Sequence, residues 1–172
     1  MATSGSTQGF GVRVCSLKRS TRQMIAPGTT YQIVQFPFGT AEPSDRYNMH
    51  QRRQPNGYVI DSANWDSDPR SGLIWPERAG WGTLQALMQW DPSDATEFRD
   101  QFVRDPFGFT PNPNDTTATD HRAVTSGGQY WTKVWGIFVD PATPLALRVA
   151  HNASAPVALR IAEFKLIIHY AE

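Results

Sequence analysis

The sequence has few charges, a single cysteine and no long apolar run. Charged residues make up 19% of the 172 residues, and the 16 Lys and Arg equal the 16 Asp and Glu. This balance argues against a nucleic-acid partner, which would require a basic surface. Cys15 has no second cysteine with which to form an intrachain disulfide. No stretch approaches the roughly 20 apolar residues of a membrane-spanning helix. The opening, MATSGSTQGF, lacks the basic start and apolar run of a signal peptide. We therefore expect folding in a cytoplasm without secretion, membrane contact or disulfides.

The chain is rich in aromatic residues and in residues that end strands. Aromatic residues make up 12% of the chain, with six Trp, and 13 Pro and 13 Gly punctuate it. Between these breaks lie short runs of alternating apolar and polar residues, which are typical of strands. Their number and spacing predict an all-β sandwich or barrel. Residues 1–8 are small and polar and predict a flexible or partner-bound arm, followed by a single domain at 9–172.

One segment, DATEFRDQFVRD, fits two kinds of secondary structure. At helical spacing it would place Phe98, Phe102 and Val103 on one face, with Asp94 as the N-cap. As a strand it would follow the turn signal of Asp91-Pro92 in an otherwise all-β chain. We predict the strand.

The closing segment, PVALRIAEFKLIIHYAE, is apolar on both parities. Val157, Leu159 and Ile161 alternate in one phase, and the next apolar residues, from Phe164 on, alternate in the other. A flat strand would put the two sets on opposite faces. Either a bulge or corner lies at Ala162-Glu163, or the second set faces something other than the chain's own core. Because Ile167 is apolar too, this strand is expected to be covered on both faces.

Two further segments share this two-sided character and predict a subunit interface. In GWGTLQALMQW, Trp81 and Leu87 have the parity opposite to Leu84. In YWTKVWGIFV, Val134 and Phe138 alternate with a second apolar set. Exposing faces of this kind to water would favour association, so we expect a symmetric oligomer. Parity alone leaves open which face of each strand meets the partner.

Several motifs match one family. The opening contributes Val12, Val14, Gln23, Ile25, Gly28, Thr29, Val34 and Phe36; the middle contributes Trp75-Pro76, Ala79-Gly80, Ala86, Trp90, Arg99 and Arg104; the end contributes LALRVAHN and EFKLIIH. This pattern resembles the jelly-roll domain of the tumour necrosis factor and complement globular-head superfamily, in the form seen in virion proteins of tailed bacteriophages. Pro141-Ala142 replaces the usual Gly-Asp, and Leu166 stands where the family often has Gly.

The resemblance implies an antiparallel jelly roll of about ten strands that forms a homotrimer. One sheet, holding the first, third, sixth and last strands in the family's order, would pack around the three-fold axis. The predicted interface residues are Trp81, Leu87, Trp131, Trp135, Leu166, Ile168 and Tyr170. The implied function is that of a phage structural protein, a capsid decoration (cement) protein or a minor tail or fibre component. Its partners would be its own copies and the major capsid protein or tail proteins, and its location the virion.

The sequence offers no convincing catalytic, metal or cofactor site. The four histidines, His50, His121, His151 and His169, lack metal-ligand spacing, although His169 could lie near a three-fold axis. Ser126, His121 and Asp120 could be drawn as a triad but lack a nucleophile elbow. Asp61, Asp66 and Asp68 lack the rest of a calcium loop. Asn152-Ala-Ser154 predicts a turn, and Cys15 a buried residue. We expect no enzymatic activity, and rate a hydrolase on this scaffold, or a cellular ligand of the tumour necrosis factor type, below the virion interpretation.

The alternative that stays open is a receptor- or carbohydrate-binding fibre head. Tyr47, Tyr58 and Trp65 lie in a long polar connection. Aromatic rings of this kind can stack on the sugar rings of a host glycan, or they can anchor the loop onto its own core or a neighbour.

Overall fold

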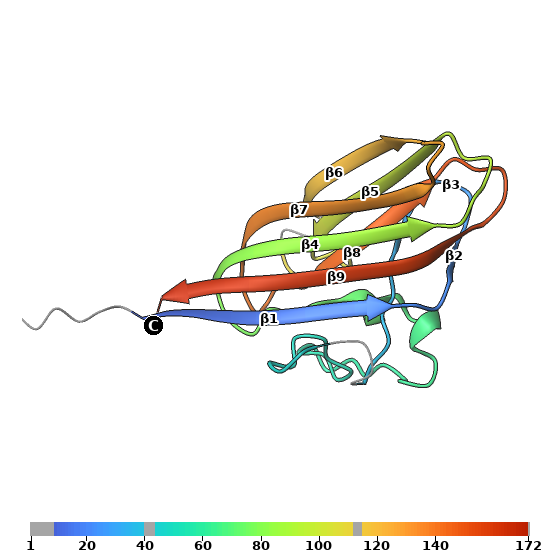
Figure 1. The fold of residues 1–172 in the computed structure, drawn as a ribbon. Coiled ribbons are helices and arrows are strands. Elements are labelled where there is room, and N and C mark those ends of the chain that lie inside the picture. Colours follow the sequence, from blue (N-terminus) through green and yellow to red (C-terminus); the bar gives the residue numbers. More distant parts are fainter. Residues whose placement is uncertain (1–8, 40–43, 112–114, 172) are drawn as a thin grey trace, which may run out of the picture.

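Two antiparallel sheets pack face to face in the computed structural model (Figure 1). The structure describes residues 9–39, 44–111 and 115–171, with the backbone alone at 115–117. The predicted arm at 1–8 lies outside the described residues. The strands are β1 (Phe10–Arg19), β2 (Gln23–Ile25), β3 (Gly28–Ile33), β4 (Gly80–Trp90), β5 (Glu97–Arg104), β6 (Asp115–Ala123), β7 (Gln129–Val139), β8 (Leu145–His151) and β9 (Val157–Ala171). Two 3-10 helices, η1 (Trp65–Ser67) and η2 (Pro69–Gly72), interrupt the long connection after β3.

The strand order is that of a jelly roll. The front sheet runs β1-β9-β4-β7, with the short β2 pairing to the end of β9, and the back sheet runs β3-β8-β5-β6. If β2 is set aside, the front sheet holds the first, third, sixth and last strands. The predicted all-β jelly-roll class is therefore confirmed, and the described residues form nine strands where about ten were expected. No helix among the described residues is long and apolar enough to cross a membrane.

The β4 and β5 strands show why the sequence forms sheets. In β4 the residues Leu84, Ala86 and Met88 are buried, and the residues between them are half-buried. In β5 the residues Phe98, Asp100 and Phe102 are buried on the face that packs on the front sheet, as the strand prediction required. This alternation has the period of a strand that contributes one face to a core.

A β-bulge in β9 resolves the change of parity at the C-terminus. Leu159 is opposite Trp90 and Ile161 is opposite Gln89, so Arg160 is an extra residue. A bulge shifts the alternation by one residue and so returns Phe164 to the same face as Leu159. The predicted position, Ala162-Glu163, was wrong by two residues. Ala162 is instead fully buried and paired with Arg19.

The core lies between the two sheets and uses both halves of the chain. Phe36 stacks on Phe164, with ring centroids 6.4 Å apart, and Phe164 stacks on Phe102 of the back sheet at 5.8 Å. A second, smaller cluster on the outer side of the back sheet joins Leu73, Trp75, Val103 and Ala146. The predicted strand GLIWP contributes a single bridge, from Ile74 to Leu145.

The parity assignment in β9 can be tested by two substitutions on the same strand. Leu166 is fully buried, so Leu166→Ala should lower the free energy of unfolding by about 2–5 kcal/mol through lost burial and a cavity. Arg160 is exposed at the bulge, and Arg160→Ala should change it by less than about 0.5 kcal/mol. Urea denaturation measures both values. Similar losses in the two variants would contradict the assigned faces.

Candidate self-association surface

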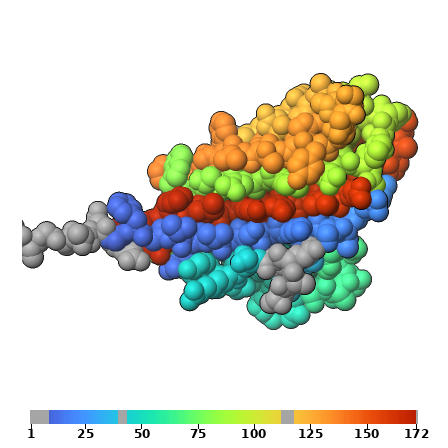
Figure 2. Space-filling model, in the orientation of Figure 1, coloured from blue at the N-terminus to red at the C-terminus, as the bar shows by residue number. Residues whose placement is uncertain are grey.

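The outer face of the front sheet is apolar at one end. Figure 2 shows β1, β9, β4 and β7 as adjacent stripes across this face. Two rows of paired residues cross it where β1 begins: Val12-His169-Trp81-Phe138, then Val14-Ile167-Thr83-Gly136. We call Phe10, Val12, Val14, Trp81, Phe138 and Ile167 the apolar patch. Trp81 is 47% exposed and Phe138 70% exposed, so the patch is left open to water by the single chain.

Trp81 is held flat across the patch by its neighbours. Its indole meets Phe138 edge to face, with ring centroids 5.1 Å apart. A Cβ atom at Gly136 would come within 2.6 Å of the Trp81 ring, so only glycine leaves room for the indole there. The large ring is thus a fixed part of the surface, which lowers the entropy cost of covering it.

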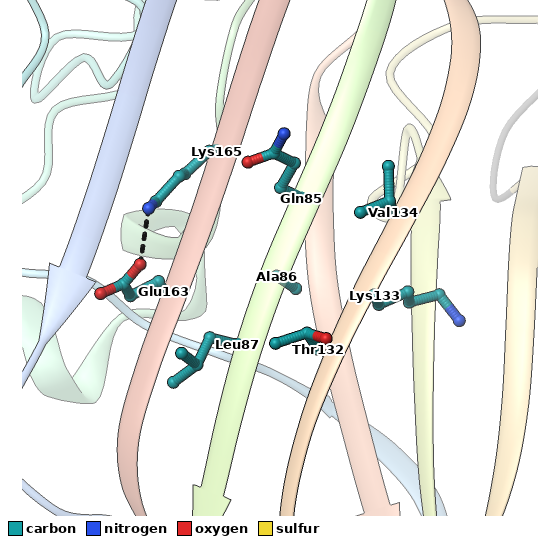
Figure 3. A pocket seen from close by; sticks show the side chains of 8 residues that line it. All are labelled: Gln85, Ala86, Leu87, Thr132, Lys133, Val134, Glu163 and Lys165. Atoms are coloured by element: carbon teal, nitrogen blue, oxygen red, sulfur yellow. Dashed lines mark ion pairs between the residues drawn. The ribbon is translucent and has the colours of Figure 1, made fainter.

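Polar residues occupy the middle of the same face. The next two rows are Ser16-Lys165-Gln85-Val134 and Lys18-Glu163-Leu87-Thr132. Figure 3 shows a hollow here, and an ion pair of 2.7 Å between Lys165 and Glu163 lies on one side of it. We call this the central hollow; it is lined by Gln85, Ala86, Leu87, Thr132, Lys133, Val134, Glu163 and Lys165.

Strand β7 leaves an apolar edge beside this face. It pairs with β4 on one side and with no other strand of the described chain. Tyr130, Val134, Trp135 and Phe138 along it are all exposed. The opposite edge of the sheet is partly covered, because Ser16 and Ser44 exchange two backbone hydrogen bonds of 2.8 Å. A long apolar edge with free backbone groups is a surface on which another chain can pack.

The predicted interface residues divide between the two sides of the front sheet. Trp81 and Leu87 lie on the outer face. Leu166 and Ile168 are fully buried in the core between the sheets, and Tyr170, 8% exposed on the same side of β9, contacts the guanidinium groups of Arg13 and Arg78. These three therefore have almost no exposed area to offer a partner, because the bulge at Arg160 places this set on the inner face of the sheet.

The two tryptophans of β7 differ in their exposure to water. Trp131 is half-buried and packs against the core. Trp135 shares the parity of the core residue Ile137 but is 48% exposed at the sheet edge. The outer-face residues Val12, Val14 and Phe10 were not predicted. Val12 and Val14 have the parity opposite to the core residues Cys15 and Leu17. The pairing of β1 with β9 shows that this parity belongs to the outer face.

A buried cluster of charges joins the sheets beside the β7 edge. The Lys133 ammonium donates to Asp100 Oδ1 at 2.9 Å and to Asp120, and Arg122 donates to Asp100. The side chains of Lys133 and Asp100 are 4% and 3% exposed. The hydrogen bond from Lys133 holds the pKa of the Asp120 carboxyl below its ordinary value. Lys133, the one charge on β7, is thereby turned inward and leaves the edge apolar.

The three loop aromatics are stacked on arginines of the chain itself. The Tyr47 ring lies 4.3 Å from the Arg13 guanidinium carbon, and Trp65 lies 4.9 Å from that of Arg19. Arg70 lies 3.9 Å from the Tyr58 ring, whose hydroxyl donates to Asp68 Oδ2 at 2.9 Å. This hydrogen bond raises the pKa of Tyr58. Tyr47 and Trp65 therefore hold the long connection against β1, whereas Tyr58 contacts residues of the connection itself.

The residues examined for chemistry have structural roles. Asp120 and His121 are consecutive in β6, so their side chains point to opposite faces, and His121 Nδ1 lies 2.9 Å from Glu97 Oε1. Asp61 accepts from the Ala63 N–H at 3.0 Å. Cys15 is fully buried, and burial raises the pKa of its thiol. Over the described ranges, no group of three or more His, Cys, Asp or Glu could hold a metal ion.

The other candidate positions also take part in the fold. His50 and His151 are buried, and their Nε2 atoms lie 2.7 Å from the Ser71 carbonyl and 3.0 Å from the Ile25 carbonyl. Asn152 Oδ1 accepts from the N–H groups of Thr96 and Glu97 at 2.9 Å, in the predicted turn. His169 is exposed on the outer face beside Trp81.

Comparisons with known proteins give distant structural likenesses. No family model and no curated protein matches the chain. It is similar over 91% of its length to murine APRIL at pH 5.0, covering 99% of that chain at 10% identity with a TM-score of 0.47. It is also similar over 91% of its length to Eiger TNF from S. frugiperda, covering 92% of that chain at 11% identity with a TM-score of 0.48. At these values the likeness carries no functional argument, and the jelly-roll assignment depends on the strand order itself.

The buried charge cluster predicts unequal effects for two lysines. Lys133→Met should lower the free energy of unfolding by about 1–3 kcal/mol, because the buried Asp100 carboxylate keeps Arg122 but loses its hydrogen bond from Lys133. Lys165→Met removes a partly exposed ion pair and should cost less than about 1 kcal/mol. Thermal or urea unfolding of both variants at neutral pH measures the difference. Equal costs would show that the cluster is solvated.

Proposed function

We propose that this chain is a structural protein of a tailed-bacteriophage virion that acts as a homotrimeric jelly roll. The observation that carries the proposal is the apolar patch, which one chain leaves open to water. At about 25 cal/mol per Å2 of apolar area, covering such a surface stabilises an assembly. The exposed aromatic side chains of the patch are Phe10, at 84% exposure, Phe138, at 70%, and Trp81, at 47%.

The positions of the patch and the β7 edge favour a closed ring of chains. The two surfaces adjoin along β7 and share Phe138, and the edge adds the side of β7 with which no described strand pairs. A contact between different surfaces of identical chains is heterologous, and it closes when the rotation between neighbours divides a full turn. The choice of three copies follows the sequence resemblance to trimeric jelly rolls.

The virion role is supported by what the chain offers to its surroundings. Its net charge is zero, which suits dense packing against neighbours. Of the residues considered for catalysis, Asp120 pairs with Lys133 and His121 lies beside Glu97. Within the virion, the chain would decorate the capsid or form a minor tail or fibre component, with the major capsid protein or tail proteins as partners.

The alternative, a receptor- or glycan-binding fibre head, depends on Tyr47, Tyr58 and Trp65. Arginine guanidinium groups already stack on these rings. A sugar would have to use the opposite ring face or displace the arginine. The anchoring contacts therefore favour the structural role, and loss of glycan binding in Trp65→Ala would favour the alternative.

The assembly part can be tested by light scattering after size exclusion. The wild-type chain at micromolar concentration should elute with three chain masses. Phe138→Glu should shift it to a monomer, because a carboxylate would be buried without a partner. Val59→Glu is the matched control, since Val59 is 46% exposed in the long connection, outside β7 and the apolar patch, and should leave the mass unchanged. A monomeric wild-type chain would contradict the proposal.

The virion part requires a separate experiment on particles. An antibody raised against the folded chain should label purified intact phage particles at regularly repeated positions, as seen by negative-stain electron microscopy. Absence of the chain from purified particles, measured by mass spectrometry, would contradict the virion role and leave the trimer untouched.

A further inference from the structure

The central hollow combines an apolar wall with hydrogen-bond acceptors. Leu87 and Val134 supply carbon surface, and Gln85 and Glu163 supply side-chain oxygens. Figure 3 shows Glu163 and Leu87 near one another on this face. Such a site suits a large apolar side chain that carries one N–H or O–H donor, which is the chemistry of tryptophan or tyrosine.

Trp135 is the exposed aromatic side chain of the front sheet that points away from this face. The exposed aromatics Phe10, Trp81, Tyr130 and Phe138 all have outer-face parity. Trp135 is paired with the core residue Leu84, so its side chain leaves β7 on the other side and stands at the free edge. Among the described residues, none accepts a hydrogen bond from its indole N–H.

We propose that Trp135 of one chain occupies the central hollow of a neighbouring copy. The inference rests on the proposed self-association and names the residue and the site that meet. An outer-face side chain meets another copy's outer face most directly when two identical faces pack around a two-fold axis. Trp135 lies on the edge, so its contact joins edge to face, as a closed ring requires. The hollow would bury the ring against Leu87 and Val134, and the Glu163 carboxylate or Gln85 carbonyl would accept from the indole.

The energetic part of the inference is tested by the concentration at which the assembly dissociates. Trp135→Ala should raise the dissociation midpoint about tenfold or more, as expected for a buried interface tryptophan. Trp135→Phe keeps a ring but loses the N–H, and should raise the midpoint less. Val59→Ala is the matched control and should leave it unchanged. An unchanged midpoint in Trp135→Ala would overturn the inference.

The geometric part is tested by disulfide crosslinking between chains. Cys15 is fully buried and does not compete. The double variant Leu87→Cys/Trp135→Cys, oxidised with copper–phenanthroline at a concentration where light scattering shows it assembled, should form covalent trimers on a non-reducing gel. Either single variant should form none.

The outcomes separate this inference from the proposed function. A wild-type chain that stays monomeric contradicts the proposed trimer itself. If the wild type is trimeric but the assembled double variant does not crosslink, only the placement of Trp135 is overturned. Covalent dimers of the single variant Trp135→Cys would overturn it too, because they would show two edges meeting around a two-fold axis.

Discussion

The pairing of β9 along both of its edges is the constraint on which the rest of the structure depends. β9 pairs with β1 and β2 on one side and with β4 on the other. This register assigns each of its side chains to one face of the front sheet, because successive residues of a strand point to opposite sides. Phe164 and Leu166 complete the core on the inner face, and Ile167 enters the apolar patch on the outer face. A slip of one residue would exchange the two sets and remove both the core and the patch.

The outer face is graded from apolar to polar. The apolar patch supplies the gain from excluding water, and the Lys165–Glu163 pair and Gln85 lie in the rows that follow it. Polar groups within an otherwise apolar contact disfavour alternative registers, because a misplaced partner would leave them unpaired. Lys133 points inward to Asp100, so the positive charge of β7 is absent from the edge and the edge remains apolar. The patch, the hollow and the edge thus form one continuous surface built around β4 and β7.

Much of the fold was readable from the sequence, and the failures have a common physical cause. Alternation in β4, β5 and β7 gave the correct strands, since half-buried strands carry the pattern in their own residues. The interface list included Leu166 and Ile168, which lie in the core, because parity shows that a strand has two apolar faces and leaves open which one faces the core. That choice depends on the bulge at Arg160, which is visible only in the pairing of β9 with β4. The arginine partners of Tyr47 and Trp65 come from β1, a segment distant in the sequence, so no local pattern could predict them.

The central claim is that further copies of this chain cover the apolar patch. Hydroxyl-radical footprinting at two protein concentrations tests it most directly, because it reads the solvent exposure of individual side chains. The account predicts that oxidation of Trp81 and Phe138 falls strongly from the dilute to the concentrated sample, and that oxidation of Tyr58, 40% exposed on the loop, stays constant. Equal oxidation of Trp81 and Phe138 at both concentrations, in samples whose light scattering shows assembly only at the higher one, would contradict it.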